Sequence, residues 1–347
     1  MKRRVLLTVC GFFLAVWGFA QTDMQTVAIV NLTKSEPITV KQFRTEVERM
    51  EKSAQRTLTE QERRSVLDGM INERLAIQAA ERDRITVSEG EVNQQINQLK
   101  AQMVQAIGRQ PTDAEFATAI RKESGLEMPA FREQVRRQLI TQKYLMSKKQ
   151  STLENIKIPT EAEIVSTYNL TKAQFVRPDT VRFSMIQVAY GTDATAKTRA
   201  KELADRLFRE IGSSASRFDE VVLRGQAPNS GYQAGDGGYL PRNMEAAQIV
   251  GQEFINVAFS LKQGEVSRLM EGARGYQIIK ISETYAQKNL ELDDIYQLGT
   301  RMTVRDYIGN VMLQERQMKV LSDATQELVN ELRAGKSFQV FDRYLIW

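Results

Sequence analysis

Residues 231–239 read Gly-Tyr-Gln-Ala-Gly-Asp-Gly-Gly-Tyr, and this glycine-rich stretch lies inside a mixed pattern of strands and helices. On both sides of it the apolar residues change between strand spacing and helix spacing. The strands we expect are 181–189, 266–270 and 276–282, and the helices are 194–211, 217–223 and 253–261. With a strand at the glycine-rich stretch, the order strand, helix, helix, strand, helix, strand, strand predicts an α+β domain of about 110 residues.

Helical sequence flanks this domain on both sides. Helix starts are marked by a hydroxyl residue followed three positions later by a glutamate, the capping-box pattern, at Thr59/Glu62, Ser88/Glu91, Thr112/Glu115 and Thr160/Glu163. Further helices are expected from 40 to 55, from Pro129 to about 150, and from 292 to about 332. We therefore expect a helical domain over residues 38–155 that the α+β domain interrupts.

Two apolar segments near the ends of the chain read as short strands. Residues 27–30 form the first, and the aromatic-rich residues 338–347 form the second. A lone short strand is not stable. We therefore expect the two strands to pair and the C-terminal helix to return to the N-terminal domain.

The first 20 residues have the layout of a secretory signal peptide. Basic residues at 2–4 precede an apolar run over 5–19, and the small residues Gly18 and Ala20 suit a cleavage site before Gln21. An uncleaved anchor is the alternative, but the run is shorter than the ~20 residues that a spanning helix needs. The pattern predicts a secreted protein that has no stable membrane insertion after cleavage.

Composition excludes several kinds of catalysis. The 347 residues include no histidine and one cysteine, Cys10, which lies inside the predicted signal peptide. Bulky Val9 and the short apolar run before Cys10 argue against a lipid-acceptor cysteine. The absence of histidine excludes Ser-His-Asp and Cys-His catalytic sites. Cleavage would also remove the one cysteine, which leaves no disulfide and no iron–sulfur ligand. No metal or cofactor is expected, and residues 235–238 lack the Lys-Ser/Thr of a phosphate-binding loop.

Charge gives no reason to expect a nucleic-acid partner. The whole chain has 48 basic and 43 acidic residues, and three of the basic residues lie in residues 1–20. The remainder therefore carries 45 basic and 43 acidic residues, which is close to neutral. Nucleic-acid binding usually needs a clear basic excess.

Five blocks carry a resemblance to a known family. In order they are VRFSMI (181–186), FDEV (218–221), GDGGY (235–239), the helix and turn at 254–267, and GYQIIK (275–280). With this order and spacing, residues 180–286 resemble a parvulin-type peptidyl-prolyl isomerase domain.

The rest of the chain is similar to the N-terminal domain of SurA-like periplasmic chaperones. The similarity lies in the strand 27–30, the helix through 67–77, the segment 85–88 and the helix from Phe131. The resemblance implies an α+β multidomain fold, a helical chaperone domain with an inserted parvulin-like domain. We place the signal peptide at 1–20, the helical domain at 21–177, the parvulin-like domain at 178–286 and the returning C-terminal helix and strand at 287–347.

The resemblance also implies where an isomerase site would lie. The two histidines of active parvulins fall at Met185 and Gln277, and the family's Cys or Asp after the short helix falls at Ala227. Prolyl isomerisation crosses a barrier of ~18–20 kcal/mol, and an enzyme lowers it by stabilising the twisted amide. An amide and a thioether do not reproduce a pair of imidazoles. We expect isomerase activity to be weak or absent.

The apolar pocket that holds proline in this family falls at three positions, Gly237, Val250 and Phe254, of which Phe254 alone is retained. Together with Met185 and Gln277 these are the candidate peptide-binding residues. Plain core packing is the alternative for Met185 and Phe254. Asp236 is expected to cap the glycine turn rather than to act as a base.

Methionines are candidates for a second, adaptable binding surface. Those on the helical domain are Met70, Met103, Met128, Met146, Met302, Met312 and Met318. A methionine on an amphipathic helix is also a common core residue, so the sequence does not choose among them. The resemblance implies an ATP-independent chaperone for unfolded outer-membrane or secreted polypeptides. The alternatives are an active peptidyl-prolyl isomerase and a structural or surface protein with a single partner.

Overall fold

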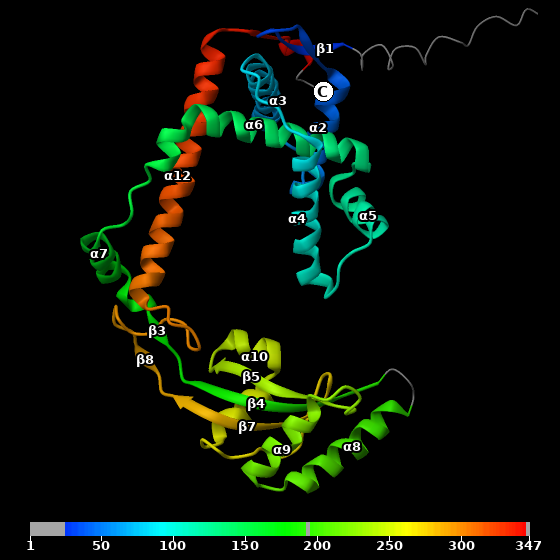
Figure 1. Cartoon of the computed structure of the whole chain (residues 1–347), viewed down its shortest axis with the longest axis vertical. Helices are drawn as coiled ribbons and strands as arrows, with labels where there is room; N and C mark the ends of the chain where they lie inside the picture. Colours follow the sequence, from blue (N-terminus) through cyan, green and yellow to red (C-terminus); the bar gives the residue numbers. More distant parts are fainter. Residues whose placement is uncertain (1–24, 192–194, 345–347) are drawn as a thin grey trace, which may run out of the picture. The chain divides into compact units, whose positions relative to one another are not determined.

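The computed structural model describes residues 25–191 and 195–344, in two compact units (Figure 1). The first unit takes its described residues from Met1–Lys157 and Arg316–Trp347, and the second is Ile158–Glu315. The predicted signal peptide lies outside the described residues, and the domain boundaries drawn from the sequence stay predictions. Among the described helices, none has the length and apolar character needed to cross a membrane.

The first unit is mainly helical and contains one small sheet. Its helices are α2 (Val40–Ala54), α3 (Glu60–Arg82), α4 (Glu89–Ile107), α5 (Asp113–Ser124), α6 (Met128–Glu154) and the C-terminal part of α12 (Val304–Ala334). Its strands are β1 (Thr26–Val30), β2 (Glu36–Thr39) and β9 (Phe338–Val340). The capping boxes predicted at Thr59, Ser88 and Thr112 are present, and a fourth at Thr39 starts α2.

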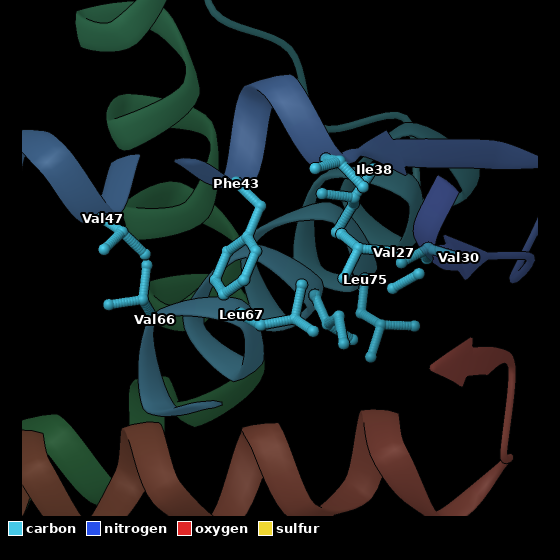
Figure 2. Close-up of a cluster of buried hydrophobic side chains, with 11 residues drawn as sticks. Val27, Val30, Ile38, Phe43, Val47, Val66, Leu67 and Leu75 are labelled. Atoms are coloured by element: carbon cyan, nitrogen blue, oxygen red, sulfur yellow. The ribbon is translucent and has the colours of Figure 1, made fainter. Parts of the chain in front are cut away.

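The sheet order is β2-β1-β9, and both pairings are antiparallel. The expected pairing of the two terminal segments is confirmed, with Ala28 opposite Val340 and Val30 opposite Phe338. The strands, α2 and α3 enclose a core that Figure 2 shows in close-up; its labelled residues are Val27, Val30, Ile38, Phe43, Val47, Val66, Leu67 and Leu75. A second cluster, Ala79, Ala80, Tyr144 and Leu328, seats α12 against α3 and α6. The returning C-terminal helix is therefore confirmed.

The second unit is an α+β domain with a helical connector. Its elements are α7 (Glu161–Thr171), β3 (Val176–Arg177), β4 (Thr180–Ala189), α8 (Ala196–Ile211), α9 (Ala215–Gly225), β5 (Gln233–Pro241), α10 (Met244–Val250), α11 (Gln252–Ser260), β6 (Met270–Gly272), β7 (Gly275–Tyr285), β8 (Lys288–Asn289) and the start of α12. The main sheet has the order β5-β4-β7-β6 and is antiparallel. Helices α10 and α11 cover one face, and α8 and α9 cover the other.

Several elements differ from the expectation. Helix α12 starts at Val304 and not at 292, because a capping box of Thr303 and Asp306 begins it. The strand expected at 266–270 is a single bridge at Val266 followed by β6. Strands β2, β3 and β8 and helix α10 were not expected. Of the terminal strand expected over 338–347, the described residues contain β9 and then a short 3₁₀ turn, Asp342–Tyr344, and residues 345–347 lie outside them. Each of these differences concerns a short element or the end of an element. At such places contacts with neighbouring elements decide the structure more than the local sequence pattern does.

Candidate functional site

Two of the predicted isomerase positions meet on the sheet face under α10 and α11. Met185 on β4 lies opposite Ile279 of β7, and Gln277 of β7 lies opposite Gln187. Because side chains alternate along a strand, Met185 and Gln277 are diagonal neighbours on one face. Met185 is half-buried and packs against the apolar cluster of that face. The Gln277 amide lies beside Gly272 of β6, where an added Cβ would come within 3.1 Å of its Oε1.

The Phe183 side chain occupies part of the predicted proline pocket. Phe254 is 6% exposed, and its ring meets the ring of Phe183 edge to face at 5.4 Å between centroids. The Phe183 ring also occupies the space over Gly237, where an added Cβ would lie 2.3 Å from its Cε2 atom. Val250 is half-buried against the same cluster. Phe183 was not a candidate in the sequence, because its strand pattern marks it only as a core residue.

Ala227 lies in the exposed turn after α9. Its N–H donates to the Arg224 carbonyl at 3.2 Å, and its own carbonyl accepts from the Ser230 N–H at 3.3 Å. A methyl side chain neither transfers protons nor attacks a carbonyl. The position therefore offers no substitute for the family's Cys or Asp.

A cluster of charged and phenolic groups lies elsewhere on the same sheet. The Asp236 carboxylate accepts from the Gly238 N–H at 2.9 Å, as a cap of the glycine turn, which confirms that expectation. Arg182 donates to Asp236 at 2.7 Å and to Glu283 at 2.9 Å. The hydrogen bond from Arg182 holds the pKa of Asp236 below its usual range. A hydrogen bond to Glu283 raises the pKa of Tyr285 to about 12. At neutral pH Asp236 stays ionised and Tyr285 stays protonated, so neither is suited to proton transfer.

The first unit carries an open groove between α12 and α3. Its volume is about 720 Å³, and its lining is Asn72, Met318, Leu321, Ser322, Thr325, Gln326, Val329, Asn330 and Arg333. Met318 is 58% exposed and Leu321 is 47% exposed. Exposed apolar side chains gathered in a hollow are typical of a binding surface. We call this feature the α12 groove.

Among the seven methionine candidates, Met318 lines the α12 groove. Met146 is also exposed, at 48%, but it lies on α6 and is not among the lining residues. The remaining five are half-buried, and all but Met302 pack against apolar clusters: Met70, Met103, Met128, Met302 and Met312. Met302 and Met312 lie in the second unit and not, as expected, in the helical domain. The tertiary structure thus makes the choice that the sequence left open.

The groove has a weak signature in the sequence. Residues 318, 321, 325 and 329 recur at helical spacing and form one stripe on α12. Ala324 and Leu328 lie on the adjoining stripe, which is buried, and Leu321, seven residues before Leu328, lies at the border between the two stripes. Periodicity detects both stripes but does not say which one another element covers.

Comparison with known proteins agrees with the two resemblances. A family described as the SurA-like N-terminal domain matches residues 2–145, and one described as the PPIC-type PPIase domain matches residues 159–297. Chaperone SurA of Alcanivorax borkumensis is 27% identical over 286 residues, which are 80% of this chain and 61% of the relative. Foldase protein PrsA of Clostridium kluyveri is 27% identical over 281 residues, 77% of this chain and 71% of the relative.

The chain spans about three-fifths of the length of three SurA relatives that it matches. A solved structure of a SurA-like chaperone from Campylobacter jejuni covers 91% of this chain with 14% identity and a TM-score of 0.39. The chain therefore carries a SurA-like N-terminal domain followed by a PPIC-type, that is parvulin-type, peptidyl-prolyl isomerase domain.

Proposed function

We propose that this protein is a periplasmic, ATP-independent chaperone that binds unfolded outer-membrane or secreted polypeptides. The observation that carries the proposal is the α12 groove, in which Met318 and Leu321 are exposed to solvent. An unfolded polypeptide presents apolar side chains together with unpaired backbone N–H and C=O groups. The flexible thioether of Met318 adapts to apolar side chains of different shape.

The rest of the groove suits the polar part of such a polypeptide. Apart from Arg333, the polar lining residues carry hydroxyl or amide groups: Asn72, Ser322, Thr325, Gln326 and Asn330. The Arg333 guanidinium already donates hydrogen bonds to Asp68 at 2.6 Å and to Asn72 at 2.8 Å. Amides and hydroxyls can donate to and accept from a peptide backbone without a preference for charge. This chemistry favours binding that is reversible and tolerant of sequence.

The first prediction concerns the groove. The variant Met318→Gln/Leu321→Gln is expected to bind a permanently unfolded polypeptide about 30-fold more weakly. The reason is that about 2 kcal/mol of apolar burial is lost when both side chains become polar. Binding would be measured by fluorescence anisotropy of the labelled polypeptide.

A matched control replaces two exposed apolar residues outside the groove. Met146→Gln/Leu223→Gln removes side chains that are 48% and 67% exposed, also on helices. Its affinity is expected to stay within about twofold of the parent. Equal losses in both variants would show that any exposed apolar residue contributes, and would contradict the assignment of the groove.

We also propose that the parvulin-type domain has weak or no isomerase activity. Met185 and Gln277 stand at the positions of the family's histidine pair, and Ala227 stands at the position of its Cys or Asp. In support, Phe183 fills the space over Gly237 and packs on Phe254. With Phe183 over Gly237 and without a pair of histidines, the site has little means to stabilise a twisted amide. The domain would then serve as a binding or spacing module.

The second prediction tests this proposal directly. Isomerisation of a short Xaa-Pro peptide, which takes tens of seconds at 25 °C, is expected to proceed at the same rate with and without the protein. An unrelated active prolyl isomerase in the same assay provides the positive control. Clear acceleration by this protein would support the rival function, an active isomerase with unusual site residues.

A further inference from the structure

The C-terminal part of α12, residues 316–334, is held on the first unit by few apolar contacts. Within this segment the buried side chains are those of Ala324 and Leu328. They pack against Ala79, Ala80 and Tyr144 of α3 and α6. Half-buried Leu332 packs against the same cluster and against the core of the first unit. These three side chains together remove only a modest apolar surface from water for a segment of five helical turns. Polar contacts must therefore contribute much of its attachment.

Two polar contacts attach the segment: Arg333 donates to Asp68 and Asn72 of α3, and a buried lysine of α6 pairs with two glutamates of α12. The Lys149 side chain is 10% exposed, and its Nζ lies 2.7 Å from Glu331 and 3.1 Å from Glu327. The two glutamates are four residues apart on α12, so they lie on one face of the helix. The hydrogen bond to Glu331 raises the pKa of Lys149, which keeps the ammonium charged at neutral pH. We call this arrangement the Lys149 clamp.

Helix α6 departs from helical geometry at the clamp itself. Lys149 has φ −119° and ψ 19°, while the helix continues on both sides to Glu154. A kink in a helix needs a cause, and neither proline nor glycine is present within residues 145–154. A charge removed from water is costly unless it is paired. The kink thus lies at the residue that pairs with both carboxylates.

We infer that residues 316–334 are a detachable strap, held by the Lys149 clamp, whose release uncovers an apolar surface for an unfolded polypeptide. Release would expose Ala79, Ala80 and Tyr144. Asn72 in the α12 groove and Ala79 are seven residues apart on α3, which places them on the same face of that helix. The other lining residues of the groove lie on α12 and would leave with the strap, so the newly exposed surface of α3 and α6 would replace the groove as the binding surface. This last step rests on the proposed function, whereas the existence of the strap does not.

Hydrogen exchange of the full chain, without any polypeptide added, tests the strap. Glu327→Gln/Glu331→Gln leaves Lys149 buried without a counter-charge, so amides 320–334 are expected to exchange at least tenfold faster. An undocked helix of this length is marginal in water and frays. Adding Lys149→Met to these two changes removes the unpaired charge and is expected to bring exchange back to within threefold of the parent.

The matched control breaks an ion pair on the solvent side of the same helix. Lys319 and Asp323 are 76% and 64% exposed, and Asp323→Asn is expected to leave exchange unchanged. Protection of β1 and α3 reports that each variant is folded. If amides 320–334 of the Glu327→Gln/Glu331→Gln variant exchange as slowly as in the parent, the inference that the Lys149 clamp holds the strap is wrong.

A second measurement separates the strap from the proposed function. Reduced, carboxymethylated α-lactalbumin, an unfolded polypeptide, is added to the parent protein. Faster exchange in 320–334 together with slower exchange in 72–83 is expected. If this polypeptide binds but the amide exchange of residues 320–334 does not change, the inference that an unfolded polypeptide releases the strap is wrong. No binding at all, with the variant results as expected, would contradict the chaperone proposal and leave the strap in place.

Discussion

Replacing Gly275 by alanine is expected to lower the free energy of unfolding of the second unit by about 3 kcal/mol. A Cβ at this position would lie 2.1 Å from the carbonyl oxygen of Val188 and 2.8 Å from Cα of Ala189. Both are backbone atoms of β4, and Gly275 pairs directly with Ala189. Neither atom can move away without breaking the pairing of β4 and β7. Relief by a simple change of side-chain rotamer is therefore not available.

Gly235→Ala is the matched control, because Gly235 lies on β5 of the same sheet with nothing within 4 Å of an added Cβ. This replacement is expected to lower the free energy of unfolding by less than about 1 kcal/mol. Urea unfolding of both variants, followed by hydrogen exchange in 180–189 and 275–285, would measure the difference. Similar decreases in the free energy of unfolding for Gly275→Ala and Gly235→Ala would contradict the steric argument. Both glycines belong to the blocks that carry the parvulin resemblance, so the comparison also shows which of them the fold requires.

Replacing Gln78 by methionine is expected to destabilise the first unit by about 3 kcal/mol. The fully buried Gln78 accepts from the backbone N–H groups of Leu32 and Thr33, each at 3.0 Å, through Oε1. Its Nε2 donates to Glu36 at 3.1 Å. Methionine keeps the length of the side chain but makes none of these bonds. Two backbone donors at the β1–β2 turn then lose their partner, at roughly 1–3 kcal/mol each.

Gln61→Met on the exposed side of the same helix serves as the control and is expected to change stability by less than about 0.5 kcal/mol. Thermal unfolding and exchange of amides in residues 26–39 would be compared for the two variants. Unchanged protection of β1 and β2 in Gln78→Met would refute this role. Because Gln78 ties the β1–β2 turn to α3, and α3 contributes Asn72 to the α12 groove, the tie also supports the candidate binding surface.

The sequence predicted the helix starts well because their signals are local. A hydroxyl group and a glutamate three residues apart satisfy each other's backbone donors wherever the helix later packs. The start of α12 was missed although Thr303 and Asp306 follow the same logic, with aspartate in place of glutamate. Strand β2 was missed because its four residues contain Pro37, which lowers strand propensity and is tolerated at the edge of the sheet.

The candidate site likewise has a part that the sequence predicted and a part that it could not predict. The resemblance located Met185, Gln277 and Phe254, and their strand and helix positions are as expected. The filling of the pocket by Phe183 could not be predicted, because it depends on the bend of β5 at Gly237 and on α11 packing behind it. The exposure of Met318 could not be predicted either, because an apolar residue at helical spacing reads the same whether a neighbour covers it or not.

By itself, the sequence determined most of the helices and most of the strands, the α+β character of the second unit, the pairing of the two terminal segments and the absence of histidine chemistry. These features depend on residues that are close in the chain, or on composition. The tertiary structure alone decided which stripe of α12 is buried, that Lys149 meets Glu327 and Glu331, and that Gln78 holds the β1–β2 turn. Each of these joins segments tens to hundreds of residues apart, and burial of a side chain is a property of the elements around it rather than of its own segment.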